Sequence, residues 1–75
     1  MNTKTILIAL RNGAEFTNYN YALTQHDQQK DTFLLQPFLN GFNGGGNEIS
    51  VYTARKLVKD WLLHSTYYNL SGGAA

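Results

Sequence analysis

The chain has 75 residues, no cysteine, and a formal net charge of +1 from six Lys and Arg against five Asp and Glu. This length predicts one domain, near the lower limit at which a hydrophobic core is sufficient by itself. The lack of cysteine excludes disulfides and cysteine-ligated zinc, and the balanced charge lacks the basic excess typical of nucleic-acid binders. Hydrophobic residues make up 43% and aromatic residues 13% of the chain, which argues against disorder.

The longest apolar run, residues 6–10, is too short for a signal-peptide core or a membrane span. We therefore expect a cytoplasmic protein that makes no contact with membranes. Because no linker divides the sequence, we expect one domain over residues 1–75, with a loose tail at residues 71–75.

The first half of the chain predicts strands. Residues 5–10 are apolar and β-branched, which is typical of a strand, and the following Asn12-Gly13 is the strongest short hairpin signal because it suits a type I′ turn. Residues 14–24 alternate and predict a second strand with Tyr19, Tyr21 and Leu23 on one face. Phe16 has the opposite parity, so it either faces the other side or follows a bulge.

The middle of the chain predicts a loop, a strand and a second loop. Residues 25–31 are uninterruptedly polar and predict a solvated loop, whereas residues 32–36 predict a third strand. Pro37 cannot donate to a ladder, so this strand should lie at an edge there or end. Residues 38–47 are rich in Gly and Asn and predict a flexible loop that carries Phe42.

The last third of the chain predicts an amphipathic helix. Ser50 suits an N-cap, with Thr53 as a second candidate. The apolar stripe that follows consists of Ala54, Leu57, Val58, Trp61 and Leu62. The opposite, polar side of the helix consists of Arg55, Lys56, Lys59 and Asp60. The residues after His64 either extend this helix toward Gly72 or form a short strand. The expected fold class is α+β, with a three- or four-stranded antiparallel sheet and one C-terminal amphipathic helix packed on one face.

No motif for catalysis, cofactor or metal is present. The glycine-rich segment at residues 41–46 has no lysine at the start of the helix, as a P-loop requires. The candidates for metal binding or acid–base chemistry are His26, Asp27, Asp31 and His64, of which three share one loop. Because a catalytic zinc usually needs three protein ligands in fixed geometry, we expect no metal, no cofactor and no enzymatic activity.

Two sets of residues are candidates for binding a partner. One helix covers only one face of a sheet, so Tyr19 and Tyr21 with Phe42 in the glycine-rich loop predict an aromatic contact surface. The alternative is that the tyrosines pack under the helix. Arg55, Lys56 and Lys59 form a basic helix face that suits nucleic acid or an acidic surface, although solvation alone explains such a face.

These features favour a protein-interaction module that inhibits a larger protein or nucleoprotein complex by occluding its surface. In its profile (short, cytosolic, aromatic-rich and free of motifs) the chain is similar to the small inhibitors of host defence encoded by phages and mobile elements, the anti-CRISPR proteins among them. No shared motif supports this resemblance, so it assigns no residues. The alternatives are a small nucleic-acid-binding protein that uses the basic helix face and a self-associating structural protein. Monomer and homodimer both remain open.

Overall fold

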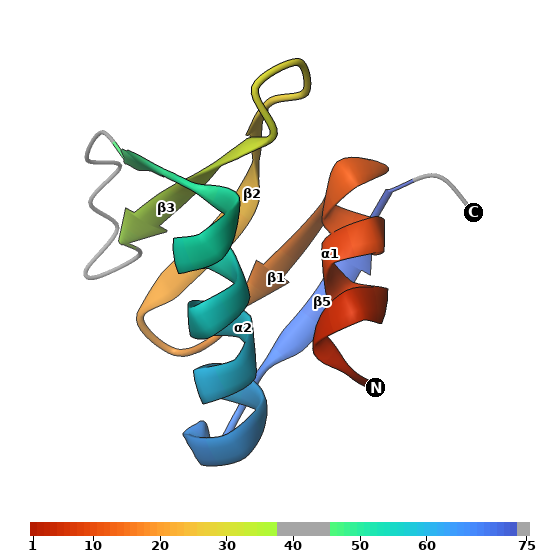
Figure 1. Cartoon of the computed structure of the whole chain (residues 1–75). Helices are drawn as coiled ribbons and strands as arrows, with labels where there is room; N and C mark the ends of the chain where they lie inside the picture. The colour runs from red at the N-terminus through yellow and green to blue at the C-terminus, as the bar shows by residue number, and fades with distance from the viewer. Residues whose placement is uncertain (38–45, 74–75) are drawn as a thin grey trace.

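The computed structural model describes residues 1–37 and 46–73 of the chain, as two helices on one side of an antiparallel sheet (Figure 1). The elements are α1 (Thr3–Arg11), β1 (Ala14–Thr17), β2 (Tyr21–Asp27), β3 (Thr32–Pro37), β4 (Asn47–Ile49), α2 (Val51–His64) and β5 (Asn69–Gly72). The five strands have the spatial order β4-β3-β2-β1-β5. The α+β class is confirmed, but the sheet has more strands than predicted and a second helix is present.

The first predicted strand is wrong, because residues 3–11 form helix α1. Asn2 is its N-cap, and the Asn2 side chain accepts a hydrogen bond from the Thr5 N–H at 2.9 Å. Ile6, Leu7 and Leu10 are buried on one side of the helix, while Ile8 is 48% exposed. A short apolar run does not distinguish a buried strand from a buried helix face, and here burial of one helical stripe decides between them.

The predicted hairpin at Asn12-Gly13 is also wrong, because these residues end α1. The Gly13 N–H donates to the Leu10 carbonyl at 3.0 Å, and Gly13 has a positive φ of 93°, whereas Asn12 has φ −96°. A type I′ turn needs a positive φ at both central residues. At the C-terminal end of a helix, by contrast, only the glycine that follows the last turn needs a positive φ.

The run at residues 14–24 is two strands joined by a tight turn. The Asn18 N–H donates to the Tyr21 carbonyl at 3.0 Å, and β1 then pairs with β2 so that Phe16 lies opposite Leu23. Phe16 and Leu23 have opposite parity in the sequence but lie on the same face of the sheet, because the chain reverses direction between them. The segment predicted as a loop is shorter than expected, because β2 continues to Asp27.

The predicted third strand is confirmed as β3, which lies inside the sheet between β2 and β4. Pro37 is the last residue of β3 and lies opposite Tyr21 of β2. On its other side, β4 pairs only with residues 33–35 in the described part of the chain. A proline is compatible with this position because no ladder partner there requires its missing N–H.

The predicted C-terminal helix is confirmed as α2. Ser50 is its N-cap and accepts from the Thr53 N–H at 3.2 Å. The alternative of a strand after His64 is the one observed, because residues 69–72 form β5 against β1. Ser71 and Gly72 therefore belong to the sheet, although the sequence assigns them to a loose tail.

Both helices pack on the same face of the sheet and enclose one core. Its buried side chains come from α1, α2 and the three central strands, and they are Ile6, Leu7, Leu10, Phe16, Leu23, Phe33, Ala54, Val58 and Trp61. The Trp61 ring stacks on Phe16 with 5.4 Å between centroids. This core holds α1 beside α2. A groove that was not predicted from the sequence lies between the two helices.

Candidate binding surfaces

The face of the sheet without helices carries mostly polar residues, with Ala22 and Leu34 among them, and does not carry the tyrosines that we expected there. Side chains alternate along a strand, so the residues of opposite parity to Phe16, Leu23 and Phe33 lie on this face. They are Glu15, Thr17, Ala22, Thr24, Leu34, Gln36, Glu48, Asn69 and Ser71. Tyr21 has the parity of Leu23 and so belongs to the helix-bearing face, and Tyr19 lies in the turn before β2. The expected location of the aromatic surface is therefore corrected.

The structure instead pairs Tyr19 with Tyr67, a residue that the sequence did not single out. Their ring centroids are 5.0 Å apart with an interplanar angle of 36°, and Tyr19 and Tyr67 are 68% and 44% exposed. Tyr67 comes from the connection between α2 and β5. Only the return of the chain from α2 to the sheet edge brings these two rings together. We call Tyr19 and Tyr67 the tyrosine pair.

The turn that carries Tyr19 is stabilised by the side chain of another of its residues, Asn18. The Asn18 Oδ1 accepts hydrogen bonds from the N–H groups of Asn20 and Tyr21, both at 2.8 Å. Such an Asx arrangement fixes the backbone of a turn. Tyr19 is thus a large exposed ring on a backbone that is already ordered.

A hollow of about 220 Å³ lies beside the tyrosine pair, lined by residues 18–20 and residues 64–67. Its walls come from the β1–β2 turn and from the segment that leaves α2. The neighbouring Tyr68 turns inward to Phe16, with 5.7 Å between ring centroids. One end of the molecule therefore combines exposed aromatic rings with a hollow. Phe42, the third aromatic residue predicted for this surface, lies outside the described residues.

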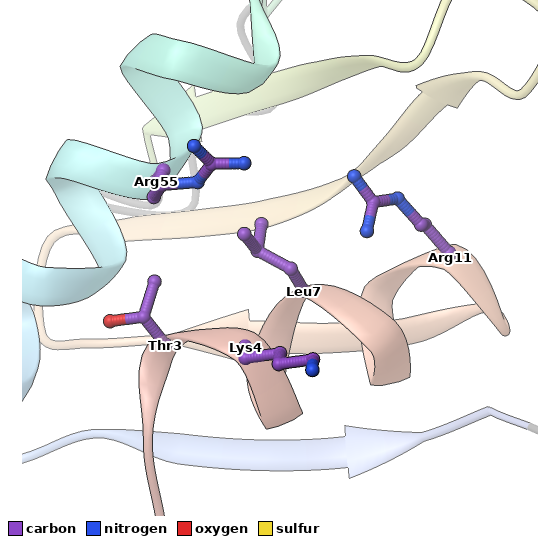
Figure 2. Close-up of a pocket in the computed structure, with 5 residues that line it drawn as sticks. All are labelled: Thr3, Lys4, Leu7, Arg11 and Arg55. Atoms are coloured by element: carbon purple, nitrogen blue, oxygen red, sulfur yellow. The ribbon is translucent and has the colours of Figure 1, made fainter.

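The three predicted basic residues of α2 are all exposed, but only Arg55 is among the residues that line a groove of the described structure. Arg55 lines a groove between α1 and α2, whereas Lys56 and Lys59 are not among its lining residues (Figure 2). The groove has a volume of about 430 Å³, and its other lining residues are Thr3, Lys4, Leu7 and Arg11 of α1. Sequence reasoning missed Lys4 and Arg11 because it assigned their segment to a strand and its turn.

Arg11 is the most constrained cation of this groove. Its Nε and Nη2 donate to the two carboxylate oxygens of Asp31 at 2.9 and 2.7 Å. Hydrogen bonding from Arg11 is the main reason that the pKa of Asp31 lies below its ordinary value, and the Arg55 charge acts in the same direction. The same hydrogen bond raises the pKa of Arg11. Asp31 stays ionised and holds the Arg11 guanidinium at the end of the groove.

Charge is segregated between the helices and the rest of the chain. The two helices contain five of the six Lys and Arg residues and one of the five acidic residues, a formal charge of +5 − 1 = +4. The remaining residues contain one lysine and four acidic residues, or +1 − 4 = −3. The net charge of +1 therefore does not show that the helices are positive and that the rest of the chain is negative.

The candidates for metal or acid–base chemistry are dispersed. Asp31 is bound by Arg11, and Asp27 accepts from the N–H groups of Gln29 and Lys30 in the β2–β3 turn. His26 lies 3.8 Å from Glu48, and His64 lies 3.9 Å from Asp60. Within residues 1–37 and 46–73, no three His, Cys, Asp or Glu side chains are grouped as a metal site requires.

Comparison of the chain with known protein families, with curated protein sequences and with solved structures gives no match. Neither helix of the described residues has the length and apolar character needed to cross a membrane.

Proposed function

We propose that the protein is a small interaction module that binds a larger protein and occludes part of its surface. The observation that carries this proposal is the tyrosine pair, which combines two exposed rings with an ordered turn. Tyrosine is enriched among the residues that dominate binding energy at interfaces, because it offers a large contact area and loses little conformational entropy. A turn that is already fixed by Asn18 lowers the entropic cost further.

We propose inhibition for two reasons: the sequence has no catalytic motif, and the molecule exposes the tyrosine pair as a binding surface. The sequence has no catalytic motif, so its effect on a partner would come from occupying a surface. This is how we interpret its resemblance in profile to the phage-encoded and mobile-element-encoded inhibitors of host defence. Tyr21 lies next to the Asn18 turn and completes the surface that we propose for the partner.

The first test compares variants of the tagged protein as bait in lysate of the cells that naturally make it. Tyr19→Ala and Tyr67→Ala each remove one ring of the pair, and Ile8→Ala is the matched control because it removes an exposed apolar side chain from α1. We expect one protein to be retained by the native chain and by Ile8→Ala, and to be lost with either tyrosine variant. Circular dichroism establishes that each variant is folded.

The second step measures affinity with the captured protein after its purification. We expect Tyr19→Ala to raise the Kd at least about tenfold, which corresponds to about 1.4 kcal/mol, and Ile8→Ala to leave it within twofold. Native affinity in both tyrosine variants would contradict the proposal. An inhibitor should also abolish the activity of the captured partner at stoichiometric concentration.

Nucleic-acid binding is the second candidate function, and the charge segregation favours it. A positive helical layer with formal charge +4 attracts phosphates, and such binding weakens steeply with salt. The combined variant Arg55→Glu, Lys56→Glu and Lys59→Glu separates the two functions. If it alone abolishes binding, and the native protein is retained on duplex DNA at low salt, the nucleic-acid function replaces ours.

A further inference from the structure

The groove between α1 and α2 has the composition of a site for a carboxylate that stands next to an apolar group. Figure 2 shows the guanidinium groups of Arg11 and Arg55 turned toward the same space, with Leu7 between them. Thr3, Leu7 and Arg11 recur every four residues and so lie on one side of α1. The groove thus has an aliphatic base and cationic ends.

Its two arginines differ in how they are engaged. Asp31 takes two of the five N–H donors of Arg11, which leaves the others available to a ligand and fixes the position of the group. Arg55 forms no ion pair with any carboxylate of the described residues. Its guanidinium carbon lies 6.0 Å from the centroid of the Tyr52 ring, at the outer limit of a cation–π contact. Arg55 is therefore the arginine of the groove whose charge is not paired with a carboxylate of the described residues.

The size of the groove points to side chains as its occupant. Its volume of about 430 Å³ falls in the range of small-molecule sites, about 300–1,000 Å³, and a single ion or water needs far less, since a water molecule occupies about 30 Å³. An arginine fork matches the two oxygens of a carboxylate. Leu7 itself is only 3% exposed, so a neighbouring apolar side chain would cover mainly the aliphatic parts of the Lys4 and arginine side chains that line the groove.

We propose that this groove binds an acidic segment of the protein partner, with a Glu or Asp carboxylate on Arg55 and an apolar side chain against the aliphatic parts of the groove lining. The identity of the segment as part of a partner rests on the proposed function, whereas binding of the acidic chemistry itself does not. Charge complementarity extends beyond the groove, because the whole helical layer is positive. An acidic segment would thus be steered toward the side of the molecule that contains the groove.

A protein segment fits this groove better than the backbone of a nucleic acid does. Phosphates recur along a strand and call for a row of cations, whereas here the apolar side chain of Leu7 separates the two arginines. Lys56 and Lys59, which would extend a basic track along α2, are not among the lining residues.

The test is a titration of the ¹⁵N-labelled protein with two synthetic peptides at low salt, followed by NMR. The acidic probe is Ac-Glu-Leu-Glu-Glu-Leu-Glu-NH₂, and its control replaces each Glu with Gln. We expect the acidic probe to shift, in a saturable manner, the amide signals of α1 and the side-chain Nε–H signals of Arg55 and Arg11. The glutamine peptide should bind at least about tenfold more weakly.

Two variants that remove the same charge from the same helix distinguish a site from general attraction. Arg55→Gln should raise the Kd of the acidic probe at least about fivefold, and Lys56→Gln, its matched control one residue away, should raise it less than twofold. Equal effects of the two substitutions would overturn the proposal, as would shifts spread evenly over the positive helices. A short DNA duplex that shifts the same signals at lower concentration than the peptide would assign the groove to nucleic acid.

Comparing Tyr19→Ala with Arg55→Gln distinguishes a failure of this inference from a failure of the proposed function. Tyr19→Ala lies outside the groove and should leave the Kd of the acidic probe within twofold of the native value. If Arg55→Gln leaves the captured partner bound while Tyr19→Ala releases it, the module binds its partner without the groove, and only this inference fails. If the acidic probe binds but no partner depends on the tyrosine pair, the proposed function fails and the site remains.

Discussion

Arg11, the last residue of α1, donates two hydrogen bonds to the carboxylate of Asp31 in the turn between β2 and β3, at 2.9 and 2.7 Å. Asp31 also accepts from the Gln25 side chain at 3.0 Å and has a positive φ of 54°. These contacts connect the C-terminal end of the first helix to a turn twenty residues further along the chain. The same pair fixes one end of the groove, so it contributes to both stability and the proposed site.

The Arg11–Asp31 pair predicts a specific dependence of stability on pH. Because the folded pKa of Asp31 lies below its ordinary value of 3.8, ionised Asp31 stabilises the fold above that value, and this contribution is lost as the pH falls through the folded pKa. Asp31→Asn should lower the free energy of unfolding at pH 7 by about 0.5–1 kcal/mol, a small effect because the pair is partly exposed.

Urea unfolding of the native chain and Asp31→Asn between pH 7 and pH 2.5 checks this prediction. Asparagine tolerates a positive φ, so the substitution removes the charge with little backbone strain. The difference between the two proteins should be constant from pH 7 to about 5 and shrink below pH 4. A difference that stays the same down to pH 2.5 would show that Asp31 acts through its shape and not its charge.

Among the proposed substitutions, we expect Trp61→Ala to cause the largest loss of stability. The side chain is 4% exposed and stacks on Phe16, so Trp61→Ala should cost about 3–5 kcal/mol. Lys59→Ala on the exposed side of α2 should change stability by less than about 0.5 kcal/mol. Thermal or urea unfolding compares the two, with Trp61→Phe as an intermediate variant that keeps a ring against Phe16. Equal stability of the alanine variants would contradict the observed orientation of α2.

The sequence predicted α2 correctly because two independent signals agree there. Ser50 supplies a cap, and the spacing of Ala54, Val58 and Trp61 matches one side of a helix over several turns. In α1 the apolar run is short and rich in Ile and Leu, so its pattern suits a strand equally well. Burial against the sheet and against α2 selects the helix, and these tertiary contacts have no local signature.

The candidate sites show the same division between local pattern and tertiary contact. Tyr19 and Arg55 were singled out from the sequence, but Tyr67 and Arg11, which stand beside them in space, were not. Each of those two partners comes from an element that the sequence left undecided or misassigned, namely the segment after α2 and the first helix. The sequence therefore indicated which kinds of residue would form the candidate sites. It did not indicate which residues lie side by side, because that depends on the packing of α1 and on the path of residues 65–68.

Gly13 distinguishes the helix end from the predicted hairpin. A Cβ at Gly13 would meet only the Gly73 Cα at 3.8 Å, which is an ordinary contact, so the cost of Gly13→Ala comes from the positive φ alone. We expect a loss of about 1 kcal/mol in the free energy of unfolding. The accompanying Asn12→Ala should cost less, because Asn12 has a negative φ and its N–H remains available.

In a type I′ hairpin, both substitutions would force a side chain into positive φ, so Asn12→Ala would also be costly. Urea unfolding of the two variants therefore tests the C-terminal end of α1 directly. Hydrogen exchange at the Gly13 N–H provides a second measurement, since its bond to Leu10 should protect it in the native chain. A loss of stability at Asn12 as large as that at Gly13 would favour the hairpin.

The final prediction concerns Asn18, which orders the turn that carries the tyrosine pair. Its Oδ1 accepts two backbone hydrogen bonds, so Asn18→Ala should lower the free energy of unfolding by about 0.5–1.5 kcal/mol. Asn20→Ala is the matched control, because in the turn Asn20 contributes its backbone N–H and alanine retains that group. We expect Asn20→Ala to change stability by less than about 0.5 kcal/mol.

Asn18→Ala should also loosen Tyr19 without removing its ring. The ¹⁵N order parameters of residues 18–20 should fall in Asn18→Ala and stay near the native values in Asn20→Ala. Because a mobile ring must be ordered on binding, the Kd for the partner should rise, chiefly through faster dissociation, while Tyr19 itself is unchanged. If the turn loosens and the Kd does not change, the order of the turn contributes nothing to binding, and the tyrosines act only through the area that they bury.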